Sequence, residues 1–585
     1  MSRLACVVHP RCNVHAGLIS VDEHERLRKE LDTREATIAA RETVIAQRDA
    51  LIDALRQLVT SLEGKNSTLE NALINHADEI ALLKRKLFGP RSERSGTSEL
   101  QLSLGDILAD VTVLQKHLDE LKKQNGDDST EPTVKPPPKN DKDRPKPKGR
   151  RDLSASDLPQ VIVEITDPEL AKKGKLIGFD ESRQLGRRRG GFFIVVKRTA
   201  KYELPTAEGT TVLGVVSPKT LLSRGMLHTS LIAWLAVEKF ALGVPHYRLE
   251  QHLDLEGVPL NRSVMCRNME ELGNALGATV VHAMFEHART ECQVLSTDAT
   301  GASIQPGPRE GGPKRPCKKG HFFTIVADRD HVLFEFTSEH SSAVVAKMFK
   351  GFKGFLQSDA SSVYDVLERG PPVLDEVGVK LVGCWAHCRR YFFEAAICKY
   401  PIGLEGLFRI RAIYLADSLL ADLPPSERMA RRAEHVAPLI DDFFDWVATK
   451  RVELQGRNLA TKALGYASNQ ANELRRVLAD GRLPLDNTRS ERALRKIVVG
   501  RKSWLFYGSE LHAQAAASIF TMIASCRLHN LDPTAYLDEL MRVLPYWPKD
   551  RYLELAPFRW AATRARLDPR ELDQPIGAIT VPENG

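Results

Sequence analysis

Three acidic side chains that lie far apart in the chain have the types and settings that metal-assisted chemistry needs. Asp298 and Asp359 each follow a short apolar run that predicts a buried strand, and Glu491 lies in an Arg-rich segment with helical periodicity. Two carboxylates at strand ends and one on a helix can converge to hold a pair of Mg²⁺ ions, or Mn²⁺ in their place. Such ions prefer oxygen ligands and keep positions open for water and phosphate. The chemistry that this pair would serve is phosphoryl transfer.

Strand and helix patterns alternate around the two Asp residues. Three strand patterns separated by short turns, and then strands separated by helices, predict a mixed sheet of the ribonuclease-H kind in an α+β or α/β multidomain chain. In that order Asp298 lies on the first strand and Asp359 on the fourth, which is next to the first. A single Asp at a strand end is commonly a turn or cap residue, so the prediction rests on the trio. The strand patterns are residues 293–298, 322–327, 332–337, 355–359 and 380–385, and the helix patterns are 341–349 and 362–369.

Glu491 is expected near the start of a helix. The interval from Asp359 to Glu491 is too long for one loop, and residues 392–478 are rich in helix formers. A helical insertion at about 390–482 is therefore predicted to interrupt the catalytic fold. Asp486 or Asn487 can cap the next helix, which places Glu491 about one turn in.

Basic side chains cluster around Glu491 and at two other places. Beside a metal site, Arg side chains suit phosphate because their forked donors match phosphate oxygens. An i, i+4 ion pair between Glu491 and Arg495 is the alternative. Residues 187–191 predict a hairpin tip that is either a contact for a DNA backbone or a solvated turn. The candidate DNA contacts are Arg489, Arg492, Arg495, Lys496, Arg501, Lys502, Arg389, Arg390, Arg187, Arg188 and Arg189.

Two Cys/His groups have to be weighed as metal ligands. The first, near the N-terminus, has its members three residues apart, which leaves loops too short for the usual structural zinc spacing. The second, Cys384 and His387, has no second pair of ligands, and His387 with its two following Arg residues is expected to orient DNA or to pack in the core. Zinc is therefore not expected. The N-terminal group is Cys6, His9, Cys12 and His15.

Residues 24–90 carry a seven-residue repeat. Branched residues at the a positions, Leu at several d positions and one Asn at a together favour a two-stranded parallel coiled coil, and so a homodimer or a higher oligomer. A long amphipathic helix packed on its own chain is the alternative. Three Arg at d weaken the first half. The a positions are Leu31, Ile38, Ile45, Ile52, Val59, Asn66, Leu73, Ile80 and Leu87.

Composition limits the class of protein. The chain of 585 residues is too long for one ordinary domain, and 42% apolar residues are enough for real cores. A net charge of +7 leans toward a polyanionic partner. The nine Cys form no dense framework, no apolar leader follows Met1, and no apolar run reaches membrane-spanning length. A cytoplasmic, nucleoid-associated protein without a membrane partner is the expectation.

The remaining segments have distinct compositions. Residues 1–23 read as a leader, 91–124 as a short helix, and 125–157 as a Pro- and Lys-rich linker. Residues 158–217 alternate like a small β-rich module, and 218–290 are helical, with a two-helix pattern around 256–260 that is either a helix-turn-helix or an ordinary helical pair. The catalytic segment would span 291–520, followed by a helical tail at 521–585.

Several motifs give the chain a specific resemblance. It resembles bacterial DDE transposases of insertion-sequence family 66 over nearly its whole length. Shorter matches fall at 87–93, 245–248 and 531–537. The two main motifs are Asp486-Asn487-x-x-x-Glu491-Arg492-Ala493-Leu494-Arg495 followed by Gly500-Arg501-Lys502-Ser503-Trp504-Leu505-Phe506, and Gly383-Cys384-Trp385-Ala386-His387-x-Arg389-Arg390.

The resemblance implies a function and a set of site residues. Asp298, Asp359 and Glu491 would be the catalytic metal ligands of a transposase that cuts at element ends and joins them to target DNA, with small accessory proteins of the same element as further partners. Two departures stand out: Ala299 takes a place where relatives often have Glu, and residues 125–265 lack the Cys of a common zinc module. A nuclease without strand transfer and a catalytically impaired DNA-binding dimer are the alternatives.

Overall fold

The computed structural model describes residues 21–88, 158–188, 190–206, 209–222, 225–307, 316–368, 378–454 and 456–583. The helix α1 (Val21–Phe88) belongs to one compact unit and the strands and helices from residue 158 onward to another, apart from a short stretch at 456–458. Three predictions lie outside the described residues: the N-terminal Cys/His group, the short helix at 91–124 and the linker at 125–157. The division into domains stays a prediction. No helix in the described ranges is long and apolar enough to span a membrane.

The N-terminal heptad segment forms one continuous helix. It runs for 68 residues as α1 without a break at Gly64, which confirms the predicted helix. The apolar side chains at the described a positions, from Leu31 to Val59, are exposed in the single chain; Leu31 is 58% exposed and Ile45 57%. A regular row of exposed branched residues is what a partner helix would cover. The pairing itself stays a prediction.

A four-stranded sheet follows at 160–214. Its strands β1 (Gln160–Ile165), β3 (Gly191–Thr206) and β2 (Lys175–Arg188) lie in that order, and β4 (Gly209–Gly214) also pairs with β3. The predicted hairpin tip is present, since Arg188 pairs with Gly191 at the end of β2 and β3. β2 has no signal in the sequence, because its polar and charged residues show no apolar alternation.

Helices link this sheet to the second one. α4 (Thr229–Ala236) continues as a short π-helix at Val237–Ala241, and α5 (His246–Leu255) and α6 (Arg262–Leu276) flank the predicted turn, with α7 (His282–Thr290) after them. The apolar face of α6 packs on α16 (Glu510–Leu528). Gly273 allows this approach, because an added Cβ would overlap the backbone of Ala515. The two helices are where the pattern predicted them; a role in DNA binding is not thereby tested.

The second sheet has five strands in the order β7-β6-β5-β8-β9. β5 (Val294–Ile304) is central: it pairs antiparallel with β6 (Lys318–Ala327) and parallel with β8 (Gly354–Gln357). β7 (His331–Thr337) pairs antiparallel with β6, and β9 (Val379–Val382) is parallel to β8. The first and fourth strands of this segment are therefore neighbours, as expected. α8 (Ser342–Met348) and a 3-10 helix (Ser362–Leu367) lie before and after β8.

Three boundaries differ from the expected ones. Asp298 does not lie at a strand end, because β5 continues to Ile304 along the longer β6. Asp359 lies two residues beyond β8 rather than in it, and Trp385 begins α9 (Trp385–Ile397) instead of ending β9. The apolar run marked only the first half of β5, and its more polar continuation left no signal in the sequence. β8 and β9 are instead shorter than predicted, because a turn and a helix begin within the predicted ranges.

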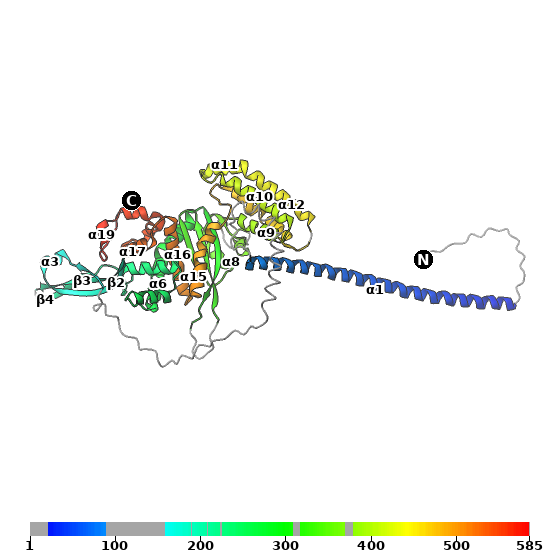
Figure 1. Ribbon diagram of the computed structural model, residues 1–585, viewed down its shortest axis with the longest axis horizontal. Helices are drawn as coiled ribbons and strands as arrows, with labels where there is room; N and C mark the ends of the chain where they lie inside the picture. The colour runs from blue at the N-terminus through cyan, green and yellow to red at the C-terminus, as the bar shows by residue number, and fades with distance from the viewer. Residues whose placement is uncertain are drawn as a thin grey trace, which may run out of the picture. The chain divides into compact units, whose positions relative to one another are not determined.

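A helical insertion separates the sheet from the helix that carries Glu491. It comprises α9, α10 (Pro401–Ser418), α11 (Pro425–His435), α12 (Ala437–Glu453), α13 (Leu459–Asn469), α14 (Ala471–Arg475) and a 3-10 turn (Arg476–Ala479), which form a group of helices beside the sheet in Figure 1. They share a core of their own around Trp385, Phe392 and Phe443.

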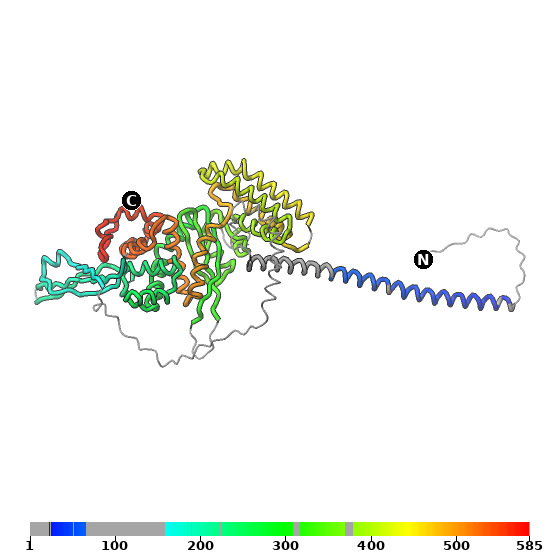
Figure 2. Tube along the Cα trace, in the orientation of Figure 1, coloured from blue at the N-terminus to red at the C-terminus, as the bar shows by residue number. Residues whose placement is uncertain are grey.

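The chain then returns to the sheet. α15 (Thr488–Trp504) contacts β5 and β6, and α16 contacts β7. Figure 2 shows the path, with the orange run of α15 beside the green strands although nearly two hundred residues separate them in sequence. α17 (Pro533–Val543), α18 (Pro557–Ala565) and α19 (Pro569–Asp573) complete the fold.

Candidate active site

Asp298 lies in the middle of the central strand β5. Its Oδ1 accepts a hydrogen bond from the Ala299 amide at 2.7 Å. Burial raises the pKa of Asp298 to about 7, the negative charges of Asp359 and Glu491 add to the rise, and the Ala299 hydrogen bond opposes it. Asp359 and Glu491 are distant from Asp298 in sequence. Because their charges nevertheless affect its pKa, the fold brings the three carboxylates near one another.

Asp359 is presented by a sharp turn after β8. Ala360 has φ of 61°, in the left-handed region, and the Ser361 amide donates to Asp359 Oδ1 at 3.1 Å. The strand behind this turn is held by Gln357, which is fully buried. Its Nε2 donates to the carbonyl oxygens of Gly383, at 3.3 Å, and Pro484, at 2.9 Å. Gln357 therefore ties the Asp359 strand to the segment that leads into α15.

Glu491 is the fourth residue of α15, about one turn in, as predicted. The helix is anchored along β5. Asn487 Nδ2 donates to the Thr297 carbonyl oxygen at 2.6 Å, and Arg501 Nη1 donates to Thr300 Oγ1 at 3.0 Å and to the Gly301 carbonyl oxygen. The first anchor lies one residue before Asp298 and one turn before Glu491. These two acids consequently face the same region.

The side chain that accepts a hydrogen bond from the first turn of α15 is Asp486, not Asn487. Its Oδ1 receives the Thr488 amide at 3.1 Å, and its Oδ2 receives the Tyr414 hydroxyl at 3.1 Å. Because Tyr414 belongs to α10, this carboxylate also links the insertion to α15. Asn487 is fully buried, and its backbone amide donates a hydrogen bond to Cys384 Sγ at 3.3 Å.

The sequence predicted that His387 orients DNA or packs in the core, but it did not predict that His387 lies beside Glu491. Its Nε2 lies 3.9 Å from Glu491 Oε1, and its Nδ1 is buried without a hydrogen-bond partner among the described residues. Its position on α9 follows from the Trp385 amide, which donates to the Leu485 carbonyl oxygen at 3.0 Å and so joins the start of α9 to the approach of α15. The Cys-Trp-Ala-His run was the signal, but only the fold shows which acid it meets.

The donor set suits divalent cations. Carboxylates from β5, from the turn after β8 and from α15 are hard oxygen ligands. In the described ranges their oxygens do not all lie within 4.8 Å of one another, since the one group that meets this limit is elsewhere. A pair of ions roughly 3.5–4 Å apart needs such a wider set, with different carboxylates serving each ion. Burial is the main reason why the pKa of Asp298 is raised, and the negative charges of Asp359 and Glu491, which bound cations would neutralise, add to the rise.

Most basic residues of α15 are open to solvent. Arg489, Arg492, Arg495, Lys496 and Lys502 are exposed. The ion pair of Glu491 is with His387, and no pair with Arg495 forms in the described part of the chain. The guanidinium of Arg501 is hydrogen-bonded to β5, so this residue has a structural role whether or not it also contacts DNA.

The other predicted basic residues have partners within the protein. Arg390 Nε lies 3.6 Å from Glu394 Oε1, and the Arg389 guanidinium lies 5.9 Å from the Phe393 ring centre. At the hairpin tip, Arg187 lies 4.4 Å from the centre of the Trp234 ring, and Arg188 lies 5.7 Å from that of Phe193. Arg189 is outside the described residues. These contacts give Arg187 a packing role irrespective of any DNA contact.

Cys384 lies in the core rather than at an open ligand position, and the expectation that Cys384 and His387 bind no zinc stays a prediction. Burial raises the pKa of Cys384 to about 12, and Cys388 is likewise fully buried with a raised pKa. A neutral buried thiol that accepts the Asn487 amide is a packing element.

A mixed sheet that gathers three acids from distant segments, flanked by a helical insertion, fits the class of DDE transposases. The comparison with known families agrees: residues 224–515 match the Transposase IS66 family, and residues 521–558 match the IS66 C-terminal element. Residues 77–163 match a family described as Transposase C of IS166 homeodomain. The chain belongs to the Transposase IS66 family.

Relatives occur in Sinorhizobium fredii (strain NBRC 101917 / NGR234). The uncharacterized protein y4qI is 25% identical over 550 residues, covering 91% of this chain and 98% of that protein. The uncharacterized protein y4hP is 26% identical over 512 residues, covering 83% of this chain and 89% of that protein. The similarity therefore extends over nearly the full length of both chains.

Proposed function

We propose that this protein is a DNA transposase of an insertion sequence, in which Asp298, Asp359 and Glu491 hold two Mg²⁺ ions. One observation carries the proposal: the charges of Asp359 and Glu491 both add to the rise in the pKa of Asp298, although the three acids come from three separate parts of the fold. Membership of the family supports the general activity. The strand order β7-β6-β5-β8-β9 supports a ribonuclease-H-like core interrupted by the α9–α14 insertion.

The residues divide the work by position. When bound, the ions would supply an activated water and neutralise charge on the attacking and leaving oxygens. Asn487 fixes the distance between α15 and β5 through the Thr297 carbonyl oxygen. His387, 3.9 Å from Glu491, orients that carboxylate. The pKa of Asp298 is raised to about 7 in the metal-free protein, and bound cations would favour its ionised form, which is the form that can act as a ligand.

DNA would approach along the exposed side of α15. Arg492, Arg495, Lys496 and Lys502 are exposed on this helix, which also carries Glu491. Cationic side chains that share a helix with a catalytic ligand can bind phosphates on either side of the scissile bond. This surface would bind both element ends and target DNA.

Pairing of two subunits would come from α1. Its row of exposed apolar residues has the spacing of a two-stranded coil, so a homodimer could hold two element ends together. Small accessory proteins of the same element would be further partners.

The test is an assay on labelled duplexes that carry the inverted repeats flanking this reading frame, with a supercoiled plasmid as target. A transposase yields cut ends and joined products with Mg²⁺, and Asp298→Asn, Asp359→Asn and Glu491→Gln yield neither. Cut products without joining would identify a metal-dependent nuclease. A gel shift without any product would contradict catalysis and leave a DNA-binding protein.

A further inference from the structure

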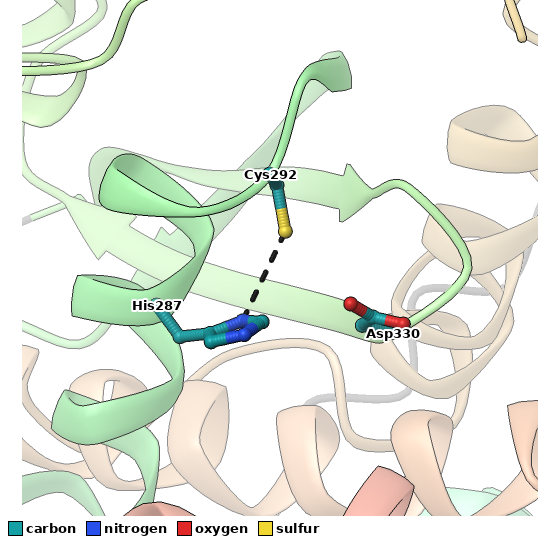
Figure 3. A group of neighbouring side chains, drawn as sticks. All are labelled: His287, Cys292 and Asp330. Atoms are coloured by element: carbon teal, nitrogen blue, oxygen red, sulfur yellow. Dashed lines mark hydrogen bonds between the residues drawn. The ribbon is translucent and has the colours of Figure 1, made fainter.

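A second group of metal-ligand side chains lies away from the three carboxylates. His287 is in the last turn of α7, Cys292 follows that helix, and Asp330 lies in the turn between β6 and β7. One ligand atom from each lies within 4.8 Å of the others. Figure 3 shows the Cys292 thiol directed at the His287 ring from above and the Asp330 carboxylate to the right of that ring.

The spacing fits a tetrahedral cation. Cys292 Sγ is 3.9 Å from His287 Nδ1. With Zn–N of about 2.0–2.1 Å and Zn–S of about 2.3 Å, a tetrahedral angle separates the two ligand atoms by roughly 3.6 Å. This pair would therefore need to close by only a few tenths of an ångström, and Asp330 has its ligand atom within 4.8 Å of both. His331 Nε2 lies 3.0 Å from His287 Nδ1, but it is not a member of this group, so water is left for the fourth position.

The surrounding structure holds these ligands in place. Asp328 accepts the amides of Gln293, at 2.9 Å, and Val294, at 3.0 Å, and so fixes the turn to the chain just after Cys292. His529 Nε2 contacts the Asp330 carbonyl oxygen at 2.8 Å from the end of α16. The Cys292 side chain is only 2% exposed. The group is thus built on well-anchored backbone rather than on a loose surface loop.

The chemistry of the donors selects the cation. A thiolate, an imidazole and a carboxylate are ligands of zinc, whereas Mg²⁺ prefers oxygen alone. Cys292 as a thiolate and Asp330 together carry two negative charges, which match one divalent cation in a partly buried setting. The zinc expectation from the sequence considered only pairs along the chain, and Asp330 comes from a different element.

We propose that His287, Cys292 and Asp330 bind one Zn²⁺ ion that fastens the end of α7 to the β6–β7 turn of the catalytic sheet. On binding, the Cys292 S–H bond is replaced by a sulfur–zinc bond and the proton passes to solvent. Cys292 stands six residues before Asp298 on a nearly extended chain, so the two sites lie roughly 20 Å apart. The role is structural: the ion would hold the strand from which Asp298 projects.

A hydrogen-bonded cluster without metal is the competing account. In that case the Cys292 thiol donates to His287, and His287 and His331 share one proton, with no cation required. The metal-free account fits the distances as they stand, whereas zinc binding requires the ligands to close and His287 Nδ1 to exchange its hydrogen bond with His331 for the metal. The two accounts differ in whether the purified protein binds a thiophilic cation through Cys292.

Cobalt(II) is the probe, because a thiolate bound to it gives a near-ultraviolet charge-transfer band that carboxylate sites do not give. Full-length protein carrying Cys6→Ser and Cys12→Ser, which removes the N-terminal thiols, is stripped with chelator and titrated with Co²⁺. We expect the band to saturate at one ion per chain and to be displaced by Zn²⁺. Cys292→Ser should abolish it, while Cys526→Ser, which alters another buried thiol, should retain it.

A second readout guards against misfolding. Zn²⁺ should raise the Tm of the wild type, and Asp330→Asn, at a half-exposed position, should weaken Zn²⁺ binding by at least about tenfold while the protein stays folded. An Asp298→Asn variant should give the same Co²⁺–thiolate band as the wild type, because Asp298 belongs to the other site. No band in the wild type, a band that survives Cys292→Ser, or unchanged Zn²⁺ binding in Asp330→Asn would overturn the proposal.

Discussion

The side-chain amide of Asn487 donates a 2.6 Å hydrogen bond to the carbonyl oxygen of Thr297, and this bond joins the helix of Glu491 to the strand of Asp298. Asn487 is fully buried, so water cannot replace the bond. The relative position of Asp298 and Glu491 therefore depends on the side-chain amide of Asn487. Because Asn487 is buried, it does not itself contact a substrate.

Asn487→Ala should therefore impair catalysis out of proportion to stability. We expect a loss of about 1–3 kcal/mol in the free energy of unfolding, because the Thr297 carbonyl oxygen loses its partner. Cleavage should fall by about 10–100-fold under conditions where the variant is fully folded. Single-turnover cleavage and urea unfolding measure the two effects, with Asn274→Ala on the exposed side of α6 as the control. Normal cleavage in Asn487→Ala would show that the bond is not needed for positioning.

Isosteric removal of each acid should separate chemistry from binding. Asp298→Asn, Asp359→Asn and Glu491→Gln keep the side-chain volume and remove a charge that the metal ions need, so cleavage and joining should drop by several orders of magnitude. DNA binding should be nearly unchanged. Asp254→Asn, at an exposed position on α5, controls for loss of an acid as such. A variant that retained near-normal Mg²⁺-dependent activity would remove its residue from the site.

The raised pKa of Asp298 predicts a pH dependence with a definite sign. The folded protein binds this proton more tightly than the unfolded chain, whose Asp pKa is near 3.9, so the contribution of Asp298 to metal-free stability should be lost as pH rises from about 4 to about 7. We expect this contribution to be about 1–2 kcal/mol in the free energy of unfolding, below the full linkage value because Asp298 is only partly buried. It is measured as the difference in stability between the wild type and Asp298→Asn, because buried His side chains with lowered pKa, such as His246 and His331, affect both proteins alike. A difference that does not shrink between pH 4 and pH 7 would contradict the assignment.

The basic residues of α15 should act through phosphates. Each lost phosphate contact should reduce the slope of log affinity against log salt by about 0.9 for duplex DNA, and by the same amount on any sequence. Alanine at Arg492, Arg495 or Lys502 should do this. Arg501→Ala should instead lower stability, because its guanidinium bonds to β5. Filter binding measures the DNA affinity of each variant over a range of salt concentrations, on element-end and on random duplexes. A loss of affinity confined to element ends would mean that these residues recognise the base sequence.

Deletion of residues 1–88 should convert a dimer into a monomer in light scattering, and paired-end complexes should be lost. Asn66→Val in the full chain should raise helix stability but relax the preference for two strands, because a polar a-position residue specifies that state. A deletion variant that stayed dimeric would place the interface in the catalytic body.

Local sequence patterns predicted the elements that depend on local apolar periodicity. The strand neighbourhood of Asp298 and Asp359 followed from the order of apolar runs, and the helix of Glu491 followed from its cap and its spacing. β2 was missed, and β5 was taken as too short, because polar residues continue both strands without alternation. Hydrogen bonds to the neighbouring strands, rather than the local sequence, keep these parts of β2 and β5 extended.

Contacts between distant elements were beyond the sequence. Nothing in the Arg-rich run around Arg501 shows that its guanidinium turns to β5, and nothing near His387 shows that it meets Glu491. The group of His287, Cys292 and Asp330 is of the same kind, since its ligands come from separate elements. Such pairs depend on how helices and strands dock, which a single sequence does not encode in any local pattern.

The central claim is that three carboxylates jointly hold a pair of divalent ions, and Mn²⁺ electron paramagnetic resonance tests it most directly. With element-end DNA bound, the wild type should take up two Mn²⁺ ions whose spins are coupled by their short separation. Asp298→Asn should lose the coupled signal while it still binds the DNA. A wild type that binds Mn²⁺ only as isolated ions, or a coupled signal that persists in Asp298→Asn, would contradict the account.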